Sequence, residues 1–90
     1  MKTVYKYQLQ MSDVTTMDIP ATGEVLSVQV QNDQFVVYIL VNTNEIETRK
    51  VAFRVAGTGR PISDVYCETF IGTVKLAENL MFHIFYREEN

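Results

Sequence analysis

The sequence predicts an all-β protein: a small antiparallel sandwich or barrel of six to seven short strands, forming a single β domain over residues 1–90. Two observations predict it. Apolar and polar residues alternate along most of the chain, as they do in strands with one buried face. Polar turns, several of them with glycine or proline, separate these stretches at short intervals, and no segment shows a convincing helical period.

The first expected strand covers residues 3–11, and its buried side carries Tyr5, Tyr7, Leu9 and Met11. A second extended piece covers residues 14–19 and stops at Pro20, which cannot donate to a strand ladder. Residues 24–31 alternate again, with Leu26, Val28 and Val30 expected inward. These three segments are the first three of the six to seven expected strands.

Asn32 and Asp33 are expected to join the third strand to residues 35–41 in a hairpin. The run over residues 35–41 is apolar on both sides, which is typical of a central strand or of one that lies against a partner subunit. Residues 48–55 make the next strand, residues 65–76 another with Gly72 as a bulge, and residues 77–79 turn the chain into a last strand over 80–87.

Composition limits the possible partners. A chain of 90 residues has a thin core, so association into a homo-oligomer is expected to bury more apolar surface. The net charge of -3 argues against binding a long nucleic acid. The single cysteine, Cys67, cannot form an intrachain disulfide, which favours a cytoplasmic location. The longest apolar run is far shorter than a membrane helix, so no membrane association is expected.

The residues available for catalysis are few. One histidine and one cysteine do not make a zinc site, and no spacing suggests another metal or cofactor, so the protein is not expected to be an enzyme. Cys67 and His83 form only a formal nucleophilic pair. His83 lies in an apolar strand, where it is either a partly buried imidazole bonded to a neighbour or a donor or stacking surface at a ligand site.

One loop has the composition of a ligand site: Gly57, Thr58, Gly59, Arg60 and Pro61. The glycines allow positive φ or close backbone approach, while the hydroxyl and the guanidinium are suited to an anion. The loop lacks the P-loop and dinucleotide fingerprints. It follows a basic segment, residues 49–60, without any acidic residue. The alternatives are a site for a small anionic ligand and an ordinary tight loop with a solvated arginine.

Five stretches resemble a family of small phage-encoded proteins known only as a domain of unknown function. They are Tyr5-Lys6-Tyr7, Ile19-Pro20, the Leu-Ser-Val-Gln-Val-Gln run over residues 26–31, Thr58-Gly59-Arg60-Pro61 and Phe82-His83-Ile84-Phe85. The resemblance covers nearly the full length, although family members often carry histidine where this chain has Arg60. Phage proteins of this kind are similar to the anti-CBASS sponges, which sequester cyclic nucleotide signals of bacterial immunity without cleaving them.

The resemblance implies a non-enzymatic, oligomeric phage protein that acts in the host bacterial cytosol and binds a small cyclic nucleotide. Arg60 and Arg54 would then pair with phosphates, the loop glycines would admit the ligand, and Tyr5, Tyr7 or Tyr66 would stack on its bases. The alternative is a protein-protein interaction module that inhibits a host enzyme or forms part of a virion.

Overall fold

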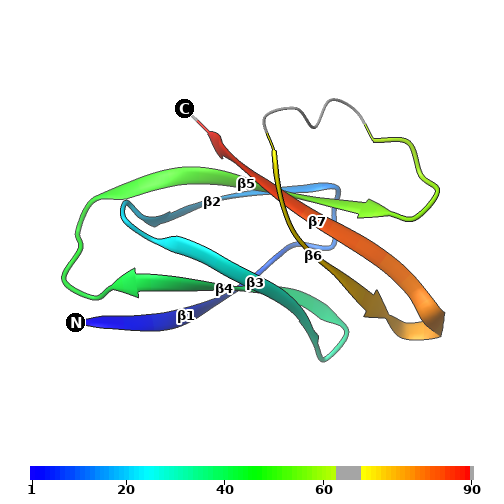
Figure 1. Ribbon diagram of the computed structural model, residues 1–90, viewed down its shortest axis with the longest axis horizontal. Helices are drawn as coiled ribbons and strands as arrows, with labels where there is room; N and C mark the ends of the chain where they lie inside the picture. Colours follow the sequence, from blue (N-terminus) through cyan, green and yellow to red (C-terminus); the bar gives the residue numbers. More distant parts are fainter. Residues whose placement is uncertain (63–67, 90) are drawn as a thin grey trace.

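The computed structural model describes residues 1–62 and 68–89 of the chain. It contains two antiparallel sheets packed face to face, and no closed barrel (Figure 1). The three-stranded sheet has the order β1-β4-β3 and the four-stranded sheet the order β2-β5-β7-β6. The prediction of an all-β fold is therefore confirmed, and the sandwich is the form that it takes.

The strands are β1 (Lys2–Gln8), β2 (Val14–Pro20), β3 (Glu24–Gln31), β4 (Gln34–Asn42), β5 (Thr48–Gly57), β6 (Thr69–Leu76) and β7 (Leu80–Glu89). A short 3-10 turn, η1 (Ala77–Asn79), joins β6 to β7. The predicted start of the sixth strand at Val65 lies outside the described residues, and so does Cys67. No helix in the described parts of the chain has the length and apolar character needed to cross a membrane.

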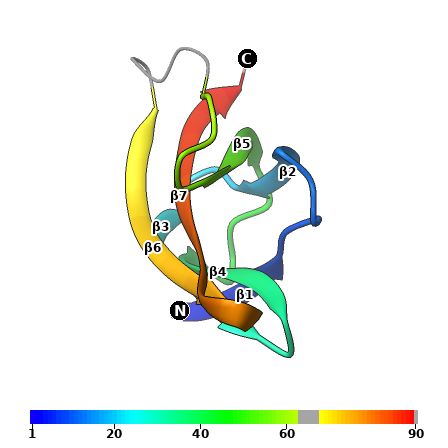
Figure 2. The same ribbon diagram turned by 90° about the vertical axis from the view of Figure 1, so that its right-hand side faces the viewer.

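The core lies between the two sheets, as Figure 2 shows from one end of the sandwich. It is formed by the inward faces of the central strands, where alternate residues are almost fully withdrawn from solvent: Phe35, Val37, Ile39 and Val41 on β4, Val51 and Phe53 on β5, and Ile84 on β7. The apolar run over residues 35–41 is the central strand of its sheet, as predicted. Its outward Val36 is buried as well.

Two local features of the backbone set the register of the strands. Asn32 and Asp33 both have positive φ, 51° and 62°, which is the geometry of a type I′ hairpin turn. The register of β3 on β4 then shifts between Val25 and Ser27. The prediction that Leu26 points inward is wrong, because this bulge reverses the alternation: Leu26 is 44% exposed, and Val25 packs on the core instead.

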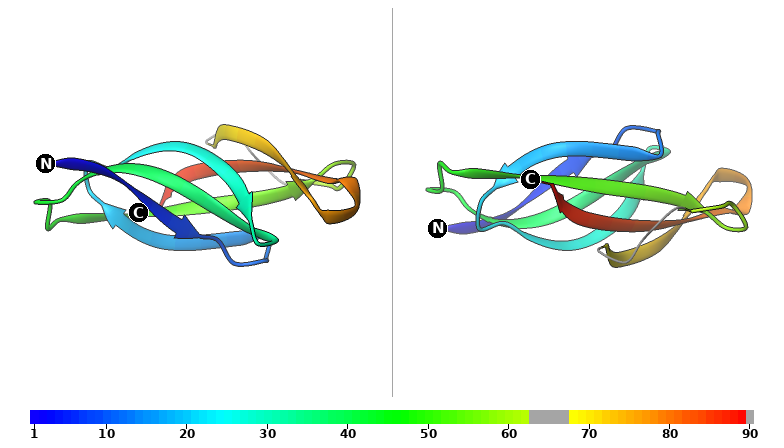
Figure 3. Two further views of the ribbon diagram at one scale, coloured as in Figure 1. Left: turned by 90° about the horizontal axis from the view of Figure 1, so that it is seen from below. Right: turned by 90° about the horizontal axis from the view of Figure 1, so that it is seen from above.

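The four-stranded sheet projects beyond the other sheet at one end. Figure 3 shows the β6–β7 turn and the end of β5 reaching past the β3–β4 turn. A second register shift, between Phe70 and Gly72, confirms the predicted bulge near Gly72 in β6. Strand β5 runs two residues further than predicted and includes Gly57, so the glycine loop begins at the end of this projecting strand.

Candidate ligand-binding pocket

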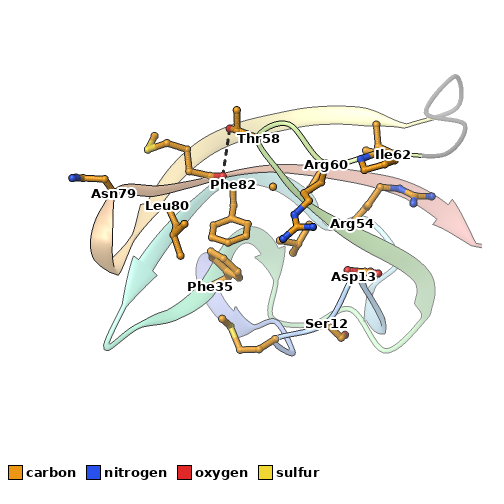
Figure 4. Close-up of a pocket in the computed structure, with 16 residues that line it drawn as sticks. Ser12, Asp13, Phe35, Arg54, Thr58, Arg60, Ile62, Asn79, Leu80 and Phe82 are labelled. Carbon is orange, nitrogen blue, oxygen red and sulfur yellow. Dashed lines mark hydrogen bonds between the residues drawn. The ribbon is translucent and has the colours of Figure 1, made fainter.

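A pocket of about 960 Å³ lies at the projecting end of the sandwich, on the right in Figure 1. Four parts of the chain line it: the β1–β2 connection, the start of β4, the end of β5 with the loop that follows, and the β6–β7 turn (Figure 4). These are the positions where the space between the sheets opens to solvent. The pocket is thus a continuation of the core, lined by apolar and polar side chains together.

Two aromatic rings stand at the base of the pocket. Phe35 and Phe82 meet edge to face, with ring centroids 5.3 Å apart and planes at 65°. Phe35 is buried, so Phe82, which is only partly buried, is the ring that a ligand would touch. A Cβ at Gly57 would lie 3.3 Å from Cγ of Arg60 and 3.6 Å from Cε1 of Phe82. The absence of a side chain there lets the Arg60 stem approach the strand.

The loop after β5 is a tight turn. The Arg60 N–H donates to the Gly57 carbonyl at 3.1 Å, and Gly59 has φ of 81°, which fits the third position of a type II turn. The Thr58 N–H donates to the Met81 carbonyl at 3.3 Å. Two N–H groups of the loop, those of Thr58 and Arg60, are therefore bonded within the protein. Gly59 itself does not line the pocket, whereas Gly57, Thr58, Arg60 and Pro61 do.

Most of the basic segment is neutralised by acidic residues from other strands. Arg49 pairs with Glu88 at 2.9 Å, Lys50 with Asp18 at 3.1 Å, and Arg54 with Glu68 at 2.9 Å. Arg60 differs from these three, since it has no ion pair and no side-chain hydrogen bond with any residue that the structure describes. Its guanidinium points into the pocket (Figure 4). The positive charge of the segment is thus concentrated at Arg60.

Arg54 lines the pocket from within a buried ion cluster. The Glu68 carboxylate, whose side chain is 2% exposed, accepts from Nε of Arg54 at 2.9 Å and from Nη1 of Arg87 at 3.4 Å. Arg87 also pairs with Glu89 at 3.1 Å. Among the described residues, the cluster joins two arginines to two carboxylates and holds the Arg54 side chain at the pocket wall.

Asp13 brings a negative charge to the same pocket. Its carbonyl accepts from the Val55 N–H at 2.9 Å, which extends the β2–β5 ladder by one bond. Its carboxylate has no hydrogen bond or ion pair within the described part of the chain. Sequence reasoning missed Asp13. The one signal in the sequence was its position: Asp13 lies two residues before Thr15, which faces the core, at the point where the chain enters β2.

His83 lies next to the pocket rather than in its lining. It occupies the outer face of its sheet, where Nε2 lies 2.7 Å from the Thr58 hydroxyl and Nδ1 lies 2.9 Å from the Thr73 hydroxyl. Both ring nitrogens therefore have partners. Since Thr58 belongs to the glycine loop, the imidazole ties that loop to the sheet through a hydrogen bond.

The predicted stacking tyrosines are not brought to the pocket. Tyr5 and Tyr7 lie on β1, on the side that faces the other sheet, and neither lines the cavity. Tyr7 packs partly against the core, and this burial, with a smaller effect from Tyr5, raises the pKa of its phenol above the usual value. Tyr66 lies outside the described residues.

Comparison with known families places the whole chain in one of them. The model of a domain of unknown function, DUF7352, matches residues 1–90. The chain belongs to this family. No curated protein and no solved structure gives a significant match.

The lining of this DUF7352 pocket combines apolar, charged and polar side chains. Among the described residues that line it, there is no histidine or cysteine, and Asp13 is the only carboxylate. Residues 1–62 and 68–89 also hold no group of three or more histidine, cysteine or acidic side chains with the spacing of a metal site. What the lining offers is an aromatic face, a cation and an anion at separate points, and hydroxyl and amide groups from Ser12, Thr58 and Asn79.

Proposed function

We propose that this DUF7352 domain sequesters a small cyclic nucleotide in the end pocket, as a phage anti-defence protein that acts in the bacterial cytosol. The observation that carries the proposal is Arg60, whose guanidinium points into the pocket and has no acidic partner among the described residues. A guanidinium without a counterion favours an anion, and its planar donors match phosphate oxygens.

The size and lining of the pocket agree with such a ligand. A volume of about 960 Å³ lies at the upper end of the range for sites that hold drug-sized molecules. Phe82 provides a ring on which a base would stack, in the role first expected of the tyrosines. Arg54 lines the same pocket from within its ion cluster.

The proposal is sequestration rather than cleavage. Hydrolysis of a phosphodiester needs a positioned base, an activated nucleophile or a metal ion. The described lining provides one carboxylate and two simple hydroxyls, Ser12 and Thr58, and the Thr58 hydroxyl is already bonded to His83. A pocket of this kind would hold its ligand and release it unchanged.

The test is to incubate the protein with a panel of cyclic di- and trinucleotides, then heat-denature it and recover the ligand. Intact recovery of one species, with a ligand-dependent rise in melting temperature, is expected. Arg60→Ala should abolish that rise and leave the unliganded melting temperature unchanged. Lys2→Ala is the matched control, because it removes the same charge from β1 at the opposite end of the sandwich. Failure to bind any member of the panel would overturn the proposal.

A second candidate function rests on a different observation. Four apolar side chains at the pocket are exposed to solvent: Met11 at 53%, Ile62 at 40%, Leu80 at 52% and Met81 at 38%. Clustered apolar groups around an arginine are typical of protein interfaces. The partner would be a host protein, a virion component or a second copy of the chain. Leu80→Glu would abolish such an association, and Arg60→Ala would then give no nucleotide-dependent effect.

A further inference from the structure

We infer that Asp13 makes the pocket selective for guanine among the nucleobases. The inference rests on the proposed function, nucleotide binding in this pocket, and goes further by assigning the base that the pocket recognises. Asp13 is the one carboxylate in the described lining, and it faces the same cavity as Arg60 and Phe82 (Figure 4).

The backbone position of Asp13 is set by hydrogen bonds at the start of β2. The Asp13 carbonyl accepts from the Val55 N–H at 2.9 Å, and the next residue, Val14, is paired with Arg54 in the β2–β5 ladder. On the other side, the Ser12 hydroxyl donates to the Val14 carbonyl at 3.1 Å. The backbone of Asp13 is therefore held where the chain enters β2, which keeps the residue at the pocket wall.

The carboxylate is also available to a ligand. It makes no hydrogen bond or ion pair with the residues of the described ranges, although Arg60 lines the same cavity. A ligand that presents negative charge to Asp13 as well as to Arg60 would be repelled by the Asp13 carboxylate. A ligand with a phosphate near Arg60 and hydrogen-bond donors near Asp13 would instead match both charges.

The donor pattern of the bases identifies which one meets this requirement. An ionised carboxylate only accepts hydrogen bonds, through two oxygens. Guanine presents two adjacent donors on its Watson–Crick edge, N1–H and the N2 amino group. Adenine and cytosine place an acceptor beside their amino group, and uracil places its single N–H between two carbonyls. Guanine is therefore the only one of these bases that donates two hydrogen bonds to a carboxylate without placing an acceptor atom against it.

Three residues of the site then bind three different parts of the ligand. Arg60 binds a phosphate, Phe82 stacks on a base, and Asp13 reads the edge of a guanine. A site that accepts hydrogen bonds from a substrate's donors favours that substrate over analogues that lack those donors. Asp13 is in this sense a specificity-determining residue.

The test is isothermal titration of the intact protein with cyclic di-GMP, cyclic di-AMP and cyclic di-UMP. The wild type should bind the guanine compound at least about 10-fold more tightly than the other two. Asp13→Asn places an amide donor against the guanine donors, so it should remove most of that preference while leaving the affinity for cyclic di-AMP equal or higher. Asp33→Asn is the matched control: Asp33 does not line the pocket, and asparagine tolerates its positive φ.

The outcomes separate the inference from the proposed function. Similar affinity for the three compounds, or a guanine preference that survives in Asp13→Asn, would overturn the role of Asp13 and leave nucleotide binding intact. If the wild type binds none of the three, and none of the wider panel, both the inference and the proposed function fail. The melting temperature of unliganded Asp13→Asn, compared with that of Asp33→Asn, shows whether the variant is folded.

Discussion

The Glu68 carboxylate lies 2.9 Å from Nη2 of Arg54, and its side chain is 2% exposed. Arg54 and the second partner, Arg87, are 17% and 30% exposed, so the acidic member is the most deeply buried part of the cluster. A buried ion pair adds little to stability relative to an apolar replacement, but removal of one partner leaves an uncompensated charge. The Glu68 carboxylate therefore helps to hold Arg54 at the pocket wall.

Glu68→Gln should therefore destabilise the protein strongly. We expect a loss of about 3–5 kcal/mol in the free energy of unfolding, because the buried carboxylate that pairs with both Arg54 and Arg87 would lose its charge. Urea denaturation of the variant and the wild type measures the difference. Asp18→Asn is the matched control, since it breaks the exposed pair with Lys50 and should cost about 0–1 kcal/mol. Equal effects of the two substitutions would contradict the burial of the cluster.

Tyr7 predicts how stability changes at high pH. Its pKa is raised in the folded state, chiefly by burial and secondarily by Tyr5, whereas the unfolded chain titrates near the usual value of about 10. As the pH rises, the unfolded chain loses this proton first. The stabilisation is thus complete below about pH 10 and is lost as the pH rises through the folded-state pKa.

Denaturant titrations at increasing pH should show this decline, and Tyr7→Phe should reduce its slope above about pH 10. Tyr5→Phe removes the secondary cause of the shift, so it should lower the pKa of Tyr7 by a smaller amount than burial raises it. Tyrosinate absorbance, followed in the folded protein, gives that pKa directly. A Tyr7→Phe variant with the same alkaline slope as the wild type would rule out this assignment.

Much of the fold was predictable from the alternation of residue types. The central place of β4 followed from its two apolar faces, and the β3–β4 turn from Asn32 and Asp33. Leu26 was placed wrongly because a bulge without glycine leaves no mark in the sequence, while it moves each residue before it to the other face. Alternation predicts which strands exist, but the register between them decides which residues are buried.

The site was harder to predict because its charges are balanced by residues distant in sequence. Nothing in residues 49–60 shows that Glu68, Asp18 and Glu88 neutralise three of the four basic residues there. Those pairings depend on the topology of the four-stranded sheet. The same topology brings Asp13 and Phe82 to the loop that carries Arg60. Tyr5 lies on β1, in the three-stranded sheet, and does not line the pocket.

Gly72 is required by its packing against Val28, where β6 lies over β3. A Cβ at Gly72 would lie 3.0 Å from Cγ1 of Val28, a core residue that is 5% exposed. Gly72→Ala should therefore cost about 1–3 kcal/mol through overpacking. In a Val28→Ala background the added methyl group has room, so the same substitution should cost less, as a double-mutant cycle in urea would show.

Gly59→Ala is the control for this packing effect. A Cβ at Gly59 would meet nothing within 4 Å, but its φ of 81° is unfavourable for alanine. We expect a loss of about 1–2 kcal/mol that does not change in the Val28→Ala background. If Gly72→Ala costs the same in both backgrounds, contact with Val28 is not the reason for the glycine.

The hydrogen bond between Thr58 and His83 should determine how firmly the Arg60 loop is attached to the sheet. The Thr58 hydroxyl lies 2.7 Å from Nε2 of His83, and Thr73 holds the other ring nitrogen at 2.9 Å. Thr58→Val retains the branched shape and removes the hydroxyl, so it should cost about 0.5–1.5 kcal/mol in the free energy of unfolding. In a His83→Phe background the imidazole partner is already absent, and the cost of Thr58→Val should be smaller. Strictly additive effects in this double-mutant cycle would show that the contact contributes nothing to the attachment of the loop.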